Sequence, residues 1–344
     1  MTALARASAA TAGSTTASPA AALAHPEAFP DDPARVEVVE THMSWVFLTE
    51  ARAYKLKKPV RYAFLDHRTL ASRQRACEEE VRLNRRLAAD VYLGVLPVAR
   101  VGDTLRVGGQ GAVVDWVVHM RRLAADRMLD RKITEGRLRP GEHRAAAALL
   151  ARFYRAAPFA GAGAGEYREG IERELLAARH ELVDPRLRLS VEDIDAAADA
   201  ALAVLHRTPG LLDARVAAGR VVEGHGDLRP EHVALGPVPA VIDCLEFARD
   251  LRILDPADEL AYLSLECERL GAPGVGTAFV AEYRRLAGDD PPERLLDLYA
   301  VLRSLVRAKL AVWRTRELTD DSARWIARAA QYVRLARDHG RRLG

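Results

Sequence analysis

The segment HGDLRPEH at residues 225–232, followed by the run AVID at residues 240–243, decides how this sequence is interpreted. Short apolar runs on either side of the polar loop predict strands, so Asp227 and Asp243 stand at the ends of neighbouring strands. Two carboxylates in this arrangement, with His232 between them, are suited to hold a divalent cation and a hydroxyl together. Oxygen ligands of this kind favour Mg²⁺.

The sequence before this segment is rich in strand signals. Val- and Phe-bearing runs with turn residues between them predict a mostly antiparallel sheet, and one long charged stretch with an imperfect apolar face predicts a helix. The strands are expected at residues 36–40, 44–49, 53–56, 96–101, 104–107 and 112–118, and the helix at 69–88.

Helical periodicity dominates the rest of the chain, at residues 142–156, 165–182 and 191–205 and again from residue 255 onward. We therefore predict an α+β fold of two lobes. The domains expected are a disordered Ala/Ser/Thr-rich tail at 1–28, an N-lobe at 29–118, and a helical C-lobe at 119–344 that carries the polar hairpin 221–247.

Composition limits the classes of function. The 344 residues are 49% hydrophobic with a formal net charge of +3, so a packed protein is expected without a global basic footprint for nucleic acid or membrane. Three widely spaced cysteines without a CxxC pair favour a reducing cytoplasm, and no apolar run approaches the length of a membrane span. Only five of 51 basic residues are lysines, and three of them fall within residues 55–58.

The 225–243 pattern resembles the catalytic loop and metal-binding Asp of protein kinases, and resembles more closely the H-G-D loop of the aminoglycoside phosphotransferases and of the related choline and fructosamine kinases. The resemblance implies a protein-kinase-like two-lobed fold, ATP and Mg²⁺ as cofactors, and a small-molecule hydroxyl as acceptor. It makes Asp227 the catalytic carboxylate, turns Arg229 toward the transferred phosphate, and makes Asp243 a metal ligand. His232 departs from the family's Asn, and imidazole favours softer ions such as Zn²⁺ or Mn²⁺.

A second resemblance lies in Ala53-Tyr54-Lys55, which is similar to the A-x-K end of a kinase strand. It implies that Lys55 binds the α- and β-phosphates of the nucleotide. Lys57 shares the face of Lys55 and is the runner-up. The kinase pattern also requires a carboxylate on the following helix, and Glu80 best continues that helix's apolar face. An ordinary surface salt bridge is the alternative for the Lys55–Glu80 pair.

No glycine-rich phosphate loop is present in the sequence. The turn at residues 41–45 lies where such a loop is expected, so its backbone amides and the Ser44 hydroxyl are candidates for phosphate contacts, with a plain hairpin turn as the alternative. The strand at residues 114–120 would be the hinge that binds adenine through its backbone. Met120 is a candidate nucleotide contact there, and a core position is the alternative.

An acidic stretch follows the hairpin and admits two interpretations. It contains Asp250, Asp255, Asp258, Glu259, Glu266 and Glu268. These carboxylates could receive a cationic amine substrate. Alternatively, Asp255 and Asp258 are helix-start residues that cap the following helix, and the remaining charges lie on the surface.

The chain is similar to bacterial aminoglycoside-phosphotransferase-like proteins that are often fused to a P-loop kinase domain, although no Walker motif occurs in this sequence. Two other functions stay open: a metal-dependent hydrolase using His225, Asp227 and His232, and a nucleotide-binding pseudokinase, which the His at position 232 favours. His225 is expected to hydrogen-bond the loop backbone in preference to binding a ligand. No nucleic-acid or membrane partner is expected, and the sequence indicates neither the acceptor nor the oligomeric state.

Overall fold

The computed structural model describes residues 18–62, 65–317 and 321–344, and the chain divides into two compact units. The first unit contains the chain up to Tyr62 together with Asp66–Glu78 and Gly94–Arg122. The second contains Leu65, Glu79–Leu93 and all described residues from Leu123 onward. The boundary therefore falls four residues beyond the predicted 118. The second half of the long helix is counted with the helical unit and not with the sheet.

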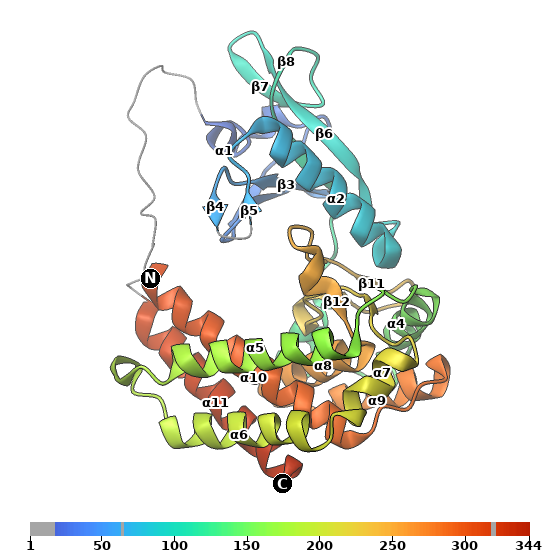
Figure 1. Cartoon of the computed structure of the whole chain (residues 1–344). Helices are drawn as coiled ribbons and strands as arrows, with labels where there is room; N and C mark the ends of the chain where they lie inside the picture. Colours follow the sequence, from blue (N-terminus) through green and yellow to red (C-terminus); the bar gives the residue numbers. More distant parts are fainter. Residues whose placement is uncertain (1–17, 63–64, 318–320) are drawn as a thin grey trace. The chain divides into compact units, whose positions relative to one another are not determined.

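The first unit is built on a six-stranded sheet in the order β1-β2-β3-β8-β6-β7 (Figure 1). Neighbouring strands pair antiparallel from β1 to β8 and between β6 and β7. Branched and aromatic side chains of β2, β3, β6, β7 and β8 share one apolar core, whereas β1 is exposed along its length. The strands are β1 (Glu37–Glu40), β2 (Ser44–Leu48), β3 (Arg52–Lys57), β6 (Tyr92–Val101), β7 (Thr104–Val107) and β8 (Ala112–Arg121), with the short β4 (Arg61–Tyr62) and β5 (Leu65–Asp66).

Helix α2 (Leu70–Ala88) packs its first half on this sheet. The buried Arg73 guanidinium pairs with Asp115 of β8 at 2.7 Å, and the Cys77 thiol lies 3.8 Å from the carbonyl oxygen of Trp116. The predicted helix and all six predicted strands are confirmed, with ends that differ by up to four residues.

The prediction of a disordered tail through residue 28 is wrong for the described part of that segment. Helix α1 (Pro19–Ala22) and the 3-10 turn η1 (Pro26–Ala28) pack beside β7. Leu23 is fully buried, and the Phe29 ring lies 4.8 Å from the ring of Tyr54. These two side chains bury enough apolar surface to order an alanine-rich segment that composition alone predicts to be unfolded. Residues 1–17 lie outside the described residues.

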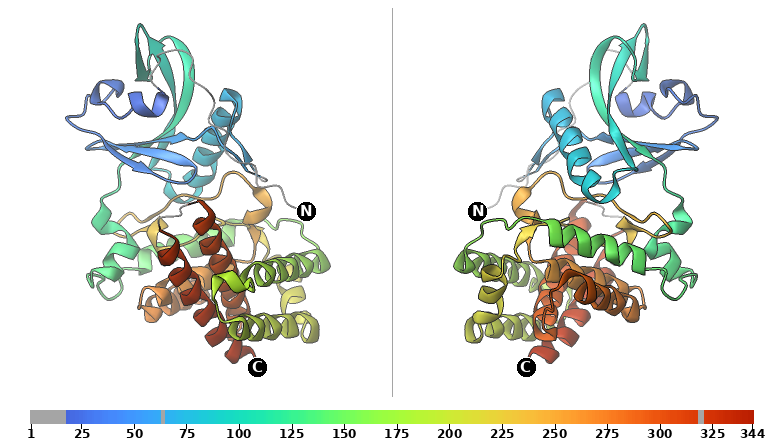
Figure 2. Two further views of the ribbon diagram at one scale, coloured as in Figure 1. Left: turned by 90° about the vertical axis from the view of Figure 1, so that its left-hand side faces the viewer. Right: turned by 90° about the vertical axis from the view of Figure 1, so that its right-hand side faces the viewer.

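The second unit is mainly helical, as predicted (Figure 2). Helices α5, α6, α10 and α11 share one apolar core, and α4, α8 and α9 pack around a second core that also contains the hairpin strands. The helices are α3 (Leu129–Thr134), α4 (Arg144–Ala156), α5 (Ala164–Leu182), α6 (Val191–Arg207), α7 (Gly210–Ala217), α8 (Pro256–Arg269), α9 (Pro273–Ala287), α10 (Glu293–Glu317) and α11 (Ser322–Leu343).

The predicted polar hairpin lies within this unit. Strand β10 (Val233–Ala234) pairs antiparallel with β11 (Ala240–Val241), and β9 (Val222–Glu223) pairs antiparallel with β12 (Ile253–Leu254). The 3-10 turn η4 (Pro230–His232) leads from the HGD loop into β10. Asp227, which precedes η4, and Asp243, which follows β11, therefore belong to one compact hairpin of the second unit.

Cys77, Cys244 and Cys267 are all buried free thiols. Across residues 18–62, 65–317 and 321–344, no helix has both the length and the apolar character that a membrane span requires.

Candidate functional site

Asp227 lies at the centre of a hydrogen-bonded cluster in the second unit. Its Oδ1 accepts from the Tyr262 hydroxyl at 3.1 Å, and its Oδ2 accepts from the Arg229 guanidinium at 2.8 Å. Burial by itself would raise the pKa of this carboxyl, but the neighbouring side chains of Arg229, His232 and Arg307 outweigh burial and lower the pKa. Asp227 is therefore a fixed, ionised carboxylate, and its side chain is still 22% exposed.

His225 has a structural role, as predicted. Its Nε2 is 2.9 Å from the carbonyl oxygen of Ile242, which can only accept, so Nε2 carries the proton. Its Nδ1 accepts the backbone N–H of Asp227 at 3.3 Å. Burial lowers the pKa of the imidazole and keeps it neutral. Both ring nitrogens are occupied, so the hydrolase alternative, which needs His225 as a metal ligand, is not supported.

Glu259 of helix α8 is a loop anchor that the sequence analysis assigned only to an acidic stretch. It is fully buried and accepts the backbone N–H groups of His225 and Gly226 and the Tyr154 hydroxyl at 2.7 Å. Gly224 makes room for it, because a Cβ at that position would lie 2.5 Å from the Glu259 carboxylate. A sequence signal that could have identified Glu259 is the pair Gly224 and Gly226 on either side of His225, together with a carboxylate near the start of the following helix.

The His232 ring lies between Asp227 and Asp243. Its Nδ1 donates to the carbonyl oxygen of Asp227 at 2.8 Å, which leaves Nε2 as an acceptor 3.3 Å from Arg229 and 3.5 Å from Asp243 Oδ2. Neighbouring ligands of an octahedral Mg²⁺ are about 3 Å apart, so the two atoms fit one divalent cation that takes its remaining ligands from water and phosphate. Within the described ranges, no group of three or more His, Cys, Asp or Glu side chains is placed to hold a metal.

Asp243 has an unusual backbone conformation. Its φ is +63°, in the left-handed region that non-glycine residues rarely adopt. Two buried side chains hold the backbone there: the Tyr92 hydroxyl accepts the Asp243 N–H at 3.1 Å, and Asn84 Oδ1 accepts the Cys244 N–H at 2.9 Å. The next turn is fixed by the Cys244 thiol, which is 3.0 Å from the carbonyl oxygen of His225. The predicted metal ligand is therefore rigidly supported, while its side chain remains 44% exposed.

Comparison with known proteins bears on this geometry. No family model matches the sequence. The uncharacterized proteins Rv2004c of Mycobacterium tuberculosis and Mb2027c of Mycobacterium bovis are each 34% identical to this chain over 318 residues. The aligned part is 88% of this chain and 59% of each relative, so the chain spans about three fifths of the length of the curated relatives it matches.

Two solved structures resemble the chain over most of its length. A candidate aminoglycoside phosphotransferase from Ralstonia eutropha has a TM-score of 0.51 at 14% identity, covering 90% of this chain and 92% of that chain. An ethanolamine kinase from Plasmodium vivax also has a TM-score of 0.51, at 8% identity, covering 88% of this chain and 81% of that chain. At such identities the likeness concerns the fold. The chain has a protein-kinase-like fold.

This kinase-like fold confirms the predicted fold class and places the nucleotide candidates of the first unit on the sheet. In the β3–β8 register, Ala53 pairs with Met120 and Lys55 pairs with Val118. Lys55 is half-buried, whereas Lys57 is only 1% exposed. The order of the two lysines as phosphate ligands stays a prediction.

Three other nucleotide candidates are buried. Ser44 is 2% exposed and lies in a tight turn in which its N–H donates to Thr41 Oγ1 at 3.0 Å. Met120 is 9% exposed, and Glu80, on the part of α2 counted with the second unit, is fully buried. The Lys55–Glu80 pair joins residues of different units and stays a prediction.

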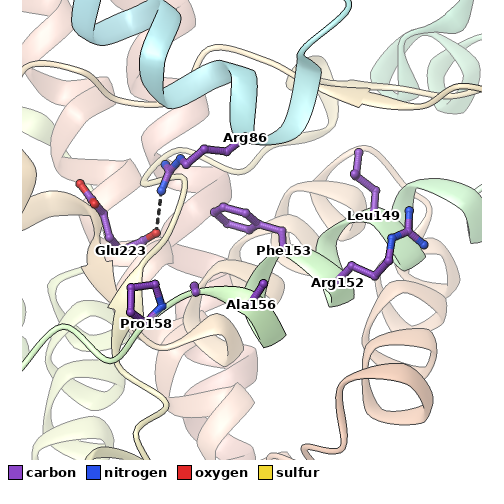
Figure 3. A pocket seen from close by; sticks show the side chains of 8 residues that line it. Arg86, Leu149, Arg152, Phe153, Ala156, Pro158 and Glu223 are labelled. Atoms are coloured by element: carbon purple, nitrogen blue, oxygen red, sulfur yellow. Dashed lines mark hydrogen bonds between the residues drawn. The ribbon is translucent and has the colours of Figure 1, made fainter.

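The second unit has a pocket of about 490 Å³ beside the C-terminal half of α2, and Asp227 is not among the residues that line it (Figure 3). The Arg86 guanidinium reaches into its wall, 5.0 Å from the Phe153 ring centroid. It donates to the carbonyl oxygens of Glu223 at 2.9 Å and Gly224 at 2.8 Å. Arg86 therefore fixes the strand that leads into the HGD loop. The pocket's other lining residues are Leu149, Arg152, Ala156, Ala157 and Pro158.

Proposed function

We propose that this chain is an ATP-dependent phosphotransferase that transfers the γ-phosphate to a hydroxyl group of a small molecule. The observation that carries the proposal is the ionised Asp227 carboxylate, which Tyr262 and Arg229 hold beside the His232–Asp243 pair. Phosphoryl transfer by kinase-like enzymes uses this combination of a positioned carboxylate and a metal-binding acidic residue. The geometry favours a phosphotransferase over a hydrolase because His225 has no free nitrogen.

In the proposed reaction, Asp227 accepts a hydrogen bond from the acceptor hydroxyl and aligns its oxygen with the γ-phosphorus. A bond forms between that oxygen and phosphorus, the bond from phosphorus to the β,γ-bridging oxygen breaks, and the hydroxyl proton passes to Asp227. Arg229 stabilises the charge of the transferred group. Positioning and charge stabilisation supply most of the rate enhancement in such reactions.

The remaining roles follow the resemblance. Asp243 Oδ2 and His232 Nε2 would hold Mg²⁺, which when bound neutralises phosphate charge. Lys55, supported by Glu80, would bind the α- and β-phosphates, the backbone around Ser44 would cover the phosphates, and Met120 would lie at the adenine.

The decisive test is Asp227→Asn, measured as acceptor-dependent ADP formation and, separately, as calorimetric binding of a non-hydrolysable ATP analogue with Mg²⁺. We expect turnover to fall by about two to four orders of magnitude, the range for a lost general base, with nucleotide affinity nearly unchanged. Asp213→Asn is the matched control, because Asp213 forms a partly exposed pair with Arg168 at 2.7 Å. Turnover within a few-fold of wild type would show that Asp227 is not the catalytic base. Nucleotide binding without turnover in the wild type would favour the pseudokinase.

A further inference from the structure

Tyr262 connects the Asp227 carboxylate to two arginines of helix α10. Its hydroxyl donates to Asp227 Oδ1 at 3.1 Å, and its ring is flanked by the guanidinium carbons of Arg303 at 5.2 Å and Arg307 at 6.0 Å from the centroid. Arg303 and Arg307 are one helical turn apart and therefore lie on the same face of α10. Tyr262 therefore contacts Asp227 through its hydroxyl, while both guanidinium groups lie beside its ring.

Arg307 has hydrogen-bonding capacity left over. Its Nε is 3.4 Å from the Tyr332 hydroxyl and 3.3 Å from Glu266, whereas its two terminal nitrogens make no hydrogen bond within the part of the chain that the structure describes. Its side chain is 22% exposed. Arg303 binds both oxygens of Asp258, at 2.7 and 2.6 Å, through Nε and one terminal nitrogen. Its other terminal nitrogen has no hydrogen-bond partner among the described residues.

The carboxylates of this region are already occupied. Glu266 is fully buried and accepts from Arg269 at 2.7 Å and from Tyr332 at 2.6 Å, and Asp258 is 5% exposed beneath Arg303. Glu259 is consumed by the loop backbone. Glu231, the remaining partly exposed carboxylate of the loop apart from the predicted catalytic and metal-binding aspartates, binds Arg229 at 2.5 Å. Apart from Asp227 and Asp243, each of these carboxylates is already bound by an arginine, a tyrosine or a backbone amide, so the unused hydrogen bonds of the residues around Tyr262 belong to arginine donors.

A surface lined by guanidinium donors favours ligands that carry negative charge and hydrogen-bond acceptors. Guanidinium groups have no acceptor, and an ammonium group has none either, so a cationic amine would gain no hydrogen bond from Arg303 or Arg307 and would be repelled by them. A carboxylate or phosphate accepts two parallel guanidinium hydrogen bonds and gains charge assistance. The earlier option of an acidic site for a cationic amine is therefore not supported.

We infer that the acceptor of this phosphotransferase is a hydroxylated oxyanion, a small molecule whose carboxylate or phosphate group is bound by Arg307 with Arg303 while Asp227 receives its hydroxyl. The claim that the bound oxyanion is the phosphate acceptor rests on the proposed function. The oxyanion site itself rests only on the arginines, their free donors and the occupied carboxylates.

The test uses one hexose series that differs in a single group: glucosamine, glucose, glucuronate and glucose 6-phosphate. Binding to the full chain is measured at constant ionic strength by the shift of the thermal unfolding midpoint with ligand concentration. We expect the two oxyanions to bind more tightly than glucose, and glucosamine most weakly. Arg307→Gln should weaken oxyanion binding by about tenfold or more, the loss typical of a hydrogen bond to a charged group, and Arg307→Lys should restore part of it.

Arg316→Gln is the matched control, because it removes the same charge from the same helix at a surface pair with Glu181. Equal binding of all four sugars, tighter binding of glucosamine, or an equal loss in the Arg316 and Arg307 variants would overturn the inference. Oxyanion selectivity that depends on Arg307, with no ADP formed from any acceptor, would support the oxyanion site and contradict the proposed transfer reaction. ADP formation with glucosamine as the best acceptor would do the reverse.

Discussion

The Tyr92 hydroxyl accepts the backbone N–H of Asp243 at 3.1 Å, at the one described residue of the hairpin that combines a side chain with a left-handed backbone. Asn84 binds the next N–H of the same turn, so two consecutive amides are held by side chains from α2 and the start of β6. Backbone strain of this kind costs about 1–3 kcal/mol and persists only where the surroundings enforce it. The direction of the Asp243 carboxylate therefore depends on two residues that cannot reach a ligand themselves.

Tyr92→Phe should raise the Mg²⁺ requirement of ADP formation, so that more Mg²⁺ is needed for the same rate. Without the hydroxyl, the Asp243 N–H loses its acceptor at a cost of about 1–3 kcal/mol, and the turn gains freedom. We expect the Mg²⁺ concentration at half-maximal ADP formation to rise several-fold. Tyr283→Phe is the control, since it removes another buried hydroxyl, which donates to Asp289 at 2.6 Å outside the cluster. A Mg²⁺ requirement that is unchanged in the Tyr92 variant would mean that the hydrogen bond only stabilises the fold.

His232→Asn should change the preference among metals. The imidazole Nε2 is a softer ligand than an amide oxygen, so the wild type should work relatively better with Mn²⁺ and the variant relatively better with Mg²⁺. The measurement is the ratio of ADP formation rates with the two ions, and it should move toward Mg²⁺ by several-fold. His206→Asn, at an exposed pair with Glu172, should leave the ratio unchanged. A ratio that is equal in wild type and the His232 variant would place the ion elsewhere.

Glu259→Gln should disorder the HGD loop. The buried carboxylate accepts two backbone N–H groups and one hydroxyl, whereas glutamine has one acceptor oxygen and would turn an NH₂ group toward donors. Each N–H left unsatisfied costs about 1–3 kcal/mol, so the thermal midpoint and turnover should both fall. Glu268→Gln tests the same change on the same helix, at a partly exposed pair with His339. Equal stability of the two variants would contradict the anchoring role.

The hairpin and the sheet could be predicted from sequence because their signals are local. Branched residues at alternate positions give the strands, and the order of glycine, carboxylate and apolar residues at 224–243 gives the loop. The support of the site could not be predicted in this way. Asn84, Tyr92 and Glu259 act through hydrogen bonds across more than thirty positions of sequence, and no local pattern indicates which buried polar group meets which amide.

The partners of the acidic stretch after the hairpin also could not be predicted from local sequence. Asp255 caps α8 as expected, accepting the N–H of Ala257 at 2.9 Å, but it also binds the buried Arg215. Asp258 lies in the first turn of α8, as expected for a helix-start residue, and its carboxylate also forms a buried bidentate pair with Arg303. Carboxylates that look available in the sequence are bound by arginines 40 and 45 positions away, which changes the inferred charge of the ligand.

Changing Lys55 or Lys57 of β3 to methionine should show which lysine binds the nucleotide phosphates and which mainly stabilises the fold. Lys55 is half-buried, so its ammonium can reach a bound phosphate, whereas Lys57 is 1% exposed and its buried charge must be compensated within the protein. Lys55→Met should weaken binding of the ATP analogue by about tenfold or more, with a small change in the thermal midpoint. Lys57→Met should change the midpoint more than the affinity. Calorimetry and thermal unfolding of both variants decide the order, and a larger affinity loss at Lys57 would make that residue the phosphate ligand.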